Sequence, residues 1–270
     1  MVKEFKTILV PVDFSLNTEV AIAKTLALVN SEEAIIHLLH VLPTLPFTDN
    51  TSAYKRAVLK LKEWKETIED CHEMITVYCQ LREGNSVQRI IREMAEETTA
   101  DVIVIGQTNM HASFFLFKTV WPMKLAAQTA IPVLTVKPGA LHRKIKTIVV
   151  PISESVPDSK LSLLAVLCKR EKPTIHLVAF GNEKSNANDH SASALLQVYQ
   201  WLKTVLHCRV VHGVVQGSNK AQAILDYAER NNADLLLVQP LQETRIGWRN
   251  KQIPDVLPRS SSVQVLAVGA

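Results

Sequence analysis

The sequence of 270 residues lacks the features that mark several classes of protein. No apolar run approaches the roughly 20 residues that a membrane-spanning helix needs, and the first residues lead straight into a short strand-like run. The four cysteines, Cys71, Cys79, Cys168 and Cys208, show no C-x-x-C spacing, which predicts free thiols. These absences predict a cytoplasmic protein without a membrane partner.

Motifs of catalysis and of metal binding are also missing. The chain holds no G-x-S-x-G elbow, no P-loop and no H-E-x-x-H, so we expect no enzyme. His37 and His176 stand at equivalent strand positions, and we interpret each as a hydrogen-bonded core or rim residue, since no carboxylate or cysteine surrounds it at ligand spacing. The pairs at 71–72 and 207–208 each combine cysteine and histidine, but adjacent residues of an extended chain point to opposite faces. We therefore expect no metal.

The charge is small and well mixed. The formal net charge is +4, and lysines alternate with glutamates in stretches such as 60–66, which is typical of a solvated helix face. The densest basic stretch, 142–146, is interpreted as a connector between domains. We expect no nucleic-acid partner.

An internal repeat organises the chain, which is long enough for two domains. The segment 6–13 recurs in character as 146–153, with identities and conservative apolar exchanges, and 100–105 recurs in character as 233–238. Each half closes with an apolar strand, and the boundary falls near Pro138-Gly139. We therefore predict two tandem domains, at residues 1–139 and 140–270.

Within each half, short β-branched runs alternate with helical stretches, a pattern typical of a parallel sheet flanked by helices. The runs are apolar at consecutive positions, so both faces of the sheet should be covered. We predict an α/β fold with five strands per half. The expected helices lie near residues 16–30, 52–72, 86–98, 118–129, 158–170, 191–206 and 219–231, while 239–262 is expected to be loop with a short helix.

Three segments carry a resemblance to a known family: 8–15, 100–106 and 130–136. In their order and spacing the chain resembles the universal stress protein family over nearly its whole length, once per half. The resemblance implies two tandem doubly wound, flavodoxin-like domains of the adenine nucleotide alpha hydrolase type, with strand order 3-2-1-4-5. It places a ligand site at the carboxyl ends of the strands, near the switch in strand order.

In ATP-binding members of the family, an Asp after the first strand contacts the nucleoside, and a G-x2-G-x9-G-[S/T] loop holds the phosphates with its backbone N–H groups. Asp13 matches this Asp and Gly106 matches the first glycine. The candidate residual ATP site of the first half comprises these two residues together with Val41, Asn109, Lys118, Thr119 and Val120. The alternatives are that Asp13 only caps the following helix and that Gly106 only ends a strand.

The rest of the loop departs from the family pattern. Asn109 and Thr119 stand at the second and third glycine positions, and Val120 stands at the Ser/Thr position. The intervening stretch 114–117 is bulky and apolar, which suits packing against protein. Lys118 could supply a phosphate contact in place of backbone amides, or it could be a solvated lysine at a helix start.

The second half departs completely. Ser153 stands at the Asp position, and Gln239, Gln242, Gln252 and Ile253 stand at the loop positions. Side chains in place of glycines remove conformational freedom and fill the space of a phosphate. We expect no ATP in this half.

These observations predict a non-enzymatic stress-response protein that acts by binding another macromolecule, with no required cofactor. The resemblance implies a pseudo-dimer whose closing strands, 132–136 and 263–268, pair within the chain; a homodimer is a further option, and the protein partner is unknown. One alternative is an ATP-binding, weakly hydrolysing protein with a single site in the first half. Another is a protein that binds a more apolar small ligand in the crevice at the carboxyl ends of the strands, where other family members bind ATP.

Overall fold

The structure is a computed structural model that describes residues 4–29, 33–44, 51–107, 120–152, 156–181, 190–247 and 251–269. Its first half comprises β1 (Thr7–Pro11), α1 (Leu16–Val29), β2 (Ala34–Leu42), α2 (Thr51–Cys71), β3 (Ile75–Glu83), α3 (Val87–Glu97), β4 (Val102–Gly106), α4 (Pro122–Gln128) and β5 (Val133–Val136). After a short 3-10 turn (Pro138–Ala140), the second half comprises β6 (Thr147–Ile152), α5 (Asp158–Glu171), β7 (Thr174–Phe180), α6 (His190–Thr204), β8 (Val210–Val215), α7 (Lys220–Arg230), β9 (Leu235–Val238), β10 (Arg245–Ile246), β11 (Lys251–Gln252), α8 (Ile253–Val256) and β12 (Gln264–Ala267).

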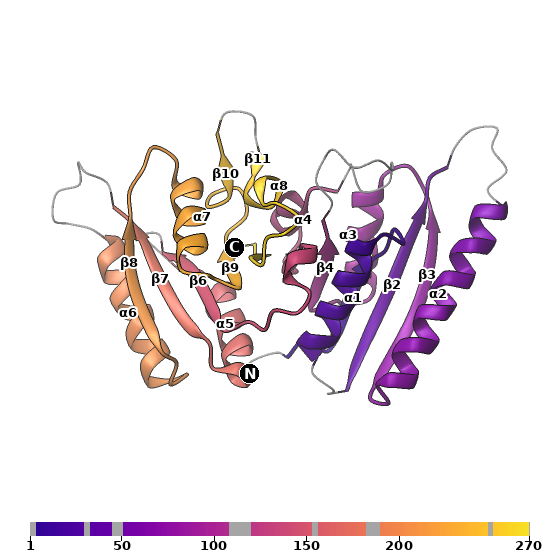
Figure 1. Ribbon diagram of the computed structural model, residues 1–270, viewed down its shortest axis with the longest axis horizontal. Coiled ribbons are helices and arrows are strands. Elements are labelled where there is room, and N and C mark those ends of the chain that lie inside the picture. The colour runs from indigo at the N-terminus through magenta and orange to yellow at the C-terminus, as the bar shows by residue number, and fades with distance from the viewer. Residues whose placement is uncertain are drawn as a thin grey trace.

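All long strands join one sheet, in the order β3-β2-β1-β4-β5-β12-β9-β6-β7-β8. Each half is parallel and has the predicted order 3-2-1-4-5, so the predicted fold class is confirmed. The halves meet where β5 and β12 pair antiparallel, with Leu134 opposite Leu266. The prediction that the closing strands pair within the chain is therefore confirmed. Figure 1 shows the two halves on either side of this junction.

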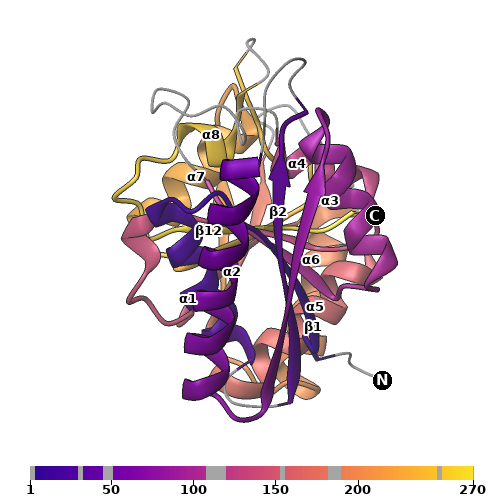
Figure 2. The same ribbon diagram turned by 90° about the vertical axis from the view of Figure 1, so that its right-hand side faces the viewer.

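Helices cover both faces of the sheet. One buried cluster holds apolar side chains of α1, α2, α5 and α6, and the other holds those of α3, α4, α7 and α8. Figure 2 shows this for the first half, where α1 and α2 lie on one side of β2 and α3 lies on the other. Each cluster contains residues from both halves. The consecutive apolar runs of the sequence are thus explained, because every such strand buries both of its faces.

One repeated carboxylate fixes the start of the first strand in each half. The Oδ2 atom of Asp101 accepts hydrogen bonds of 3.0 and 2.9 Å from the backbone N–H groups of Lys6 and Thr7. Asp234 repeats this with Lys146 and Thr147, at 2.9 and 3.0 Å. The repeated Ala-Asp pair in the sequence therefore has a structural cause. Each aspartate directly precedes β4 or β9 in the chain and bonds to the start of the first strand of its half, β1 or β6.

The element boundaries differ from the prediction mainly in two places. The helix expected over 118–129 is described from Pro122, where proline occupies the first helical position. The segment expected to be loop with a short helix contains α8, as predicted, but also the two-stranded antiparallel hairpin of β10 and β11. Strands of two residues carry no periodic signal, so this hairpin could not be predicted from the residue pattern. The four cysteines are free thiols, as expected.

Candidate functional site

Three of the described candidate residues of the first half gather at one edge of the sheet. Asp13 follows β1, Val41 lies near the end of β2, and Gly106 ends β4. These three strands are neighbours in the order β2-β1-β4, so their carboxyl ends meet. Val120 packs against the same buried cluster that contains Val41. Asn109, Lys118 and Thr119, together with Ser153 and the stretch 114–117, lie outside the described residues.

Asp13 caps the start of α1. Its Oδ1 accepts hydrogen bonds from the Ser15 N–H at 3.0 Å, the Ser15 hydroxyl at 2.5 Å and the Thr18 hydroxyl at 2.6 Å. The Thr18 hydroxyl oxygen in turn accepts from the Asp13 N–H at 3.0 Å. In the part of the chain that the structure describes, Oδ2 of Asp13 makes no hydrogen bond. The carboxylate thus has a complete local role and keeps one oxygen for a further donor.

Gly106 is required by packing. A Cβ atom on this residue would lie 1.9 Å from the backbone oxygen of Asn17, far inside contact distance. The first turn of α1 therefore approaches β4 so closely that no other residue type fits here. Because the glycine has this explanation, its match to the family motif carries little information about a phosphate.

An aromatic cluster beside Asp13 was not found from the sequence. The Phe14 ring lies 4.4 Å from that of His40 and 5.3 Å from that of Trp64, between centroids. Nδ1 of His40 lies 2.7 Å from the Val12 carbonyl oxygen, which can only accept, so Nδ1 carries the proton. Burial lowers the pKa of His40, although this bond and the nearby Asp13 oppose the shift. Phe14 has φ of 60°, a left-handed conformation that no sequence pattern indicated.

The second half can be aligned with the first through matching hydrogen bonds. The N–H of Thr18 bonds to the Ser15 carbonyl oxygen at 3.0 Å, and the N–H of Lys160 bonds to the Pro157 carbonyl oxygen at 3.0 Å, each at the start of its helix. Lys160 therefore replaces Thr18. The residue that serves the Asp13 cap in one half is a lysine in the other.

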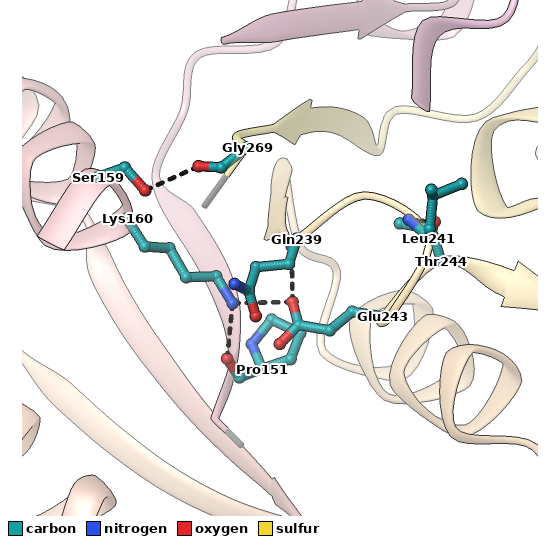
Figure 3. A network of polar contacts seen from close by, with 8 residues as sticks. All are labelled: Pro151, Ser159, Lys160, Gln239, Leu241, Glu243, Thr244 and Gly269. Carbon is teal, nitrogen blue, oxygen red and sulfur yellow. Dashed lines mark hydrogen bonds and ion pairs between the residues drawn. The ribbon is translucent and has the colours of Figure 1, made fainter. Parts of the chain in front are cut away.

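Lys160 forms a buried ion pair with Glu243, shown in Figure 3. Its Nζ lies 2.8 Å from Glu243 Oε2 and donates to the Pro151 carbonyl oxygen at 2.9 Å. Glu243 Oε2 also accepts from the backbone N–H of Gln239 at 2.8 Å. Both charged side chains are only 1% exposed. Burial lowers the pKa of Lys160, and the Glu243 carboxylate opposes this shift.

The ion pair bridges the carboxyl ends of the two strands that correspond to β1 and β4. Pro151 lies in β6, and Gln239 directly follows β9. Val102 corresponds to Leu235, because each pairs with the same position of the first strand of its half. Four residues further on, Gly106 therefore corresponds to Gln239. The backbone N–H at the first glycine position of the second half thus already donates to a carboxylate of the protein.

The other loop positions of the second half also lie in protein contacts. Ile253 is fully buried in α8, and Gln252 Oε1 accepts from the Thr244 hydroxyl at 2.5 Å. Gln242 is exposed. Of the positions that the family motif indicated in this half, three are built into the fold around the hairpin.

The two histidines at equivalent strand positions contact aromatic side chains. His37 stacks on Tyr78, with 5.4 Å between ring centroids, and His176 Nδ1 lies 3.1 Å from the Tyr227 hydroxyl. Across the described ranges, no group of three or more His, Cys, Asp or Glu side chains could hold a metal ion. Across the same ranges, no helix is both long and apolar enough to cross a membrane.

Comparisons with known proteins agree with this geometry. A family model described as the universal stress protein family matches residues 4–137. A universal stress protein from Archaeoglobus fulgidus DSM 4304 has a similar structure over 99% of this chain and 99% of its own, with a TM-score of 0.73 and 18% identity. A functionally unknown protein from Pseudomonas aeruginosa PAO1 is similar over 98% of this chain and 92% of its own, with a TM-score of 0.59 and 14% identity. At these identities the solved structures show the fold alone, and no curated protein matches the chain.

Proposed function

This chain belongs to the universal stress protein family, and from that membership we propose that it is a non-enzymatic, cytoplasmic stress-response protein that acts by binding another macromolecule. In this proposal ATP binding is lost in the second half and largely lost in the first. The two domains, 1–139 and 140–270, act as one pseudo-dimeric body.

One observation carries the proposed loss of ATP binding in the second half: the buried pair of Lys160 and Glu243. A triphosphate at this edge would need the backbone N–H of Gln239, which already bonds to Glu243 at 2.8 Å. It would also bring its negative charge against a carboxylate that is 1% exposed, where repulsion is weakly screened. Opening the crevice would separate a buried ion pair, at a cost of about 3–5 kcal/mol.

A specific observation favours the alternative of one ATP site in the first half. Oδ2 of Asp13 makes no hydrogen bond within the described residues, so a ribose hydroxyl could donate to it. Against this alternative, Oδ1 is committed to the α1 cap, and Gly106 is explained by its contact with Asn17. The loss of the remaining glycines at positions 109 and 119 weighs against a tightly held phosphate.

Titration calorimetry of the full chain with Mg-ATP tests the proposal. We expect no saturable heat and no nucleotide retained through purification. Saturable heat that Asp13→Asn abolishes, and that the same substitution at Asp158 leaves unchanged, would establish the first-half site and overturn the proposed loss. Asp158 is a suitable control because it lies in the first turn of α5, the equivalent helix of the other half.

Native mass spectrometry of the freshly purified chain tests the assembly. The proposal gives a monomeric chain, because β5 and β12 already pair with each other inside it. A homodimer would require another surface.

A further inference from the structure

A cavity lies between the two halves, near the amino ends of the strands, whereas the candidate ATP site lies at their carboxyl ends. It has a volume of about 250 Å³. Its walls come from the last turns of α1, from α5 and from the connector 141–145, and they are mostly apolar: Phe5, Leu28, Leu141, Ile145, Val166 and Leu167. Ligand pockets for drug-sized molecules span about 300–1,000 Å³, so this cavity suits a smaller ligand.

Two buried polar side chains line the cavity with unused hydrogen-bonding capacity. Lys24 is 5% exposed, and its Nζ donates to the Arg143 carbonyl oxygen at 2.5 Å, which uses one of its three N–H groups. Gln264 is fully buried; its Nε2 bonds to the Asp234 carbonyl oxygen at 3.4 Å, and its Oε1 has no hydrogen-bond partner within the described part of the chain. A buried polar atom without a partner is costly and calls for an explanation.

The repeat shows that the fold itself does not require these two residues. The shift that aligns Thr18 with Lys160 aligns Lys24 with Val166. The strand registers align Gln264 with Pro132. Ile103 pairs with Val133 as its counterpart Leu236 pairs with Val265, and Pro132 and Gln264 are the residues just before these partners. The equivalent positions of the duplicate are therefore apolar. Each polar group is present once, and both line the same cavity.

The charge around the cavity favours an anion. The lining includes His142, Arg143, Lys144 and Lys169 besides Lys24, and Glu4 is its single acidic member. Glu4 is paired with Lys169 at the rim, so the excess is basic. A buried ammonium with spare donors binds a carboxylate well, since a hydrogen bond between charged groups is about twice as strong as a neutral one.

We propose that this cavity binds a small amphipathic carboxylate that also carries a hydroxyl or N–H group. The apolar body lies against Phe5, Leu141 and Val166. The carboxylate accepts from Lys24 Nζ, and the hydroxyl or N–H donates to Gln264 Oε1. This site is separate from the crevice considered above, so it stands whether or not the first half binds ATP.

Calorimetry of the full chain with three probes tests the proposal: β-hydroxydecanoate and decanoate below their micelle concentrations, and decanol below its solubility limit. We expect β-hydroxydecanoate to bind most tightly and decanol least. Lys24→Met should remove the preference for carboxylate over alcohol, about tenfold or more, since it removes a charge-assisted hydrogen bond. Gln264→Leu should remove the preference for the hydroxylated acid and leave that for carboxylate in place.

Two further variants separate the cavity from general effects. Ala27→Trp adds a large side chain at an exposed lining position, keeps both polar groups and should abolish binding of all three probes. Lys169→Met removes an exposed rim charge and should keep both preferences. The proposal is overturned if the wild-type chain binds none of the probes, if Ala27→Trp binds them unchanged, or if Lys169→Met has the same effect as Lys24→Met. The last result would mean that the preference for carboxylate comes from the general positive charge of the cavity and not from a direct contact with Lys24.

Discussion

Separating the buried pair of Lys160 and Glu243 should be the most informative perturbation of the second half. At 2.8 Å the two charges attract by about 6 kcal/mol for an effective dielectric constant of about 20, and burial of both charges offsets much of this. Removing one partner keeps the burial cost of the other. Lys160→Met should therefore lower the free energy of unfolding by about 3–5 kcal/mol.

The companion variant, Glu243→Gln, should lose stability in a pH-dependent way. It leaves the ammonium of Lys160 buried with the Pro151 carbonyl as its acceptor. Burial already lowers the pKa of Lys160, and loss of the carboxylate lowers it further. The folded state then binds fewer protons than the unfolded state below the ordinary lysine pKa of 10.5, so the stability of this variant should rise with pH towards that value.

Urea unfolding of the wild type, Lys160→Met, Glu243→Leu and the double variant Lys160→Met/Glu243→Leu measures the effect, and Glu243→Gln is followed across pH. The double variant should lie within about 1 kcal/mol of the wild type, because a well-packed apolar pair can replace a buried ion pair. Single losses below about 1 kcal/mol, or a double loss equal to the sum of the single losses, would refute the assignment of a coupled buried pair. It would also remove the main support for a closed second-half crevice.

Three further outcomes follow from the fold. Asp101→Ala and Asp234→Ala should each lower the free energy of unfolding by about 1–3 kcal/mol, and urea unfolding should find the losses additive within about 0.5 kcal/mol, because β4 and β9 are three strand positions apart. Gly106→Ala should lower the melting temperature more than Gly247→Ala. At Gly247 no atom lies within 4 Å of the added methyl group, so this substitution costs only the strain of a residue with φ of 64°. Equal shifts in melting temperature would contradict the packing explanation. Acidification from about pH 7 to about pH 5 should lower the free energy of unfolding, because burial lowers the pKa of His40 and the unfolded state takes up the proton first. The dependence of this free energy on pH should become weaker in His40→Gln, and an unchanged dependence would contradict the explanation.

The sequence predicted the sheet well because its signal is local and repeated. A strand such as 102–106 is apolar at every position, and a helix such as 87–97 places its buried residues three and four apart, so each element can be recognised alone. The pairing of β5 with β12 was predicted from the family resemblance and from the need of edge strands for partners. The β10–β11 hairpin was missed because its strands are too short to carry a period.

The candidate site was less predictable, for two physical reasons. A glycine required by packing and a glycine required by a ligand look identical in sequence. Gly106 is required by packing, because a side chain there would collide with the backbone of Asn17. Lys160 and Glu243 are 83 residues apart, and each alone is an ordinary charged residue. Only the fold brings them together, at a depth where charge must be paired.

The polar residues that break the repeat suggest how duplication has been used in this chain. Two identical halves joined at β5 and β12 would bury the same side chains twice. Instead, Lys160 stands where the first half has Thr18, and Lys24 stands where the second half has Val166. A buried lysine costs stability unless a partner compensates it, so each such exchange requires a change elsewhere. For Lys160 that change is visible as Glu243. For Lys24 the protein supplies the Arg143 carbonyl oxygen and the nearby charge of the Asp234 carboxylate, and the remaining donors of Nζ are the physical reason to look for a ligand between the halves.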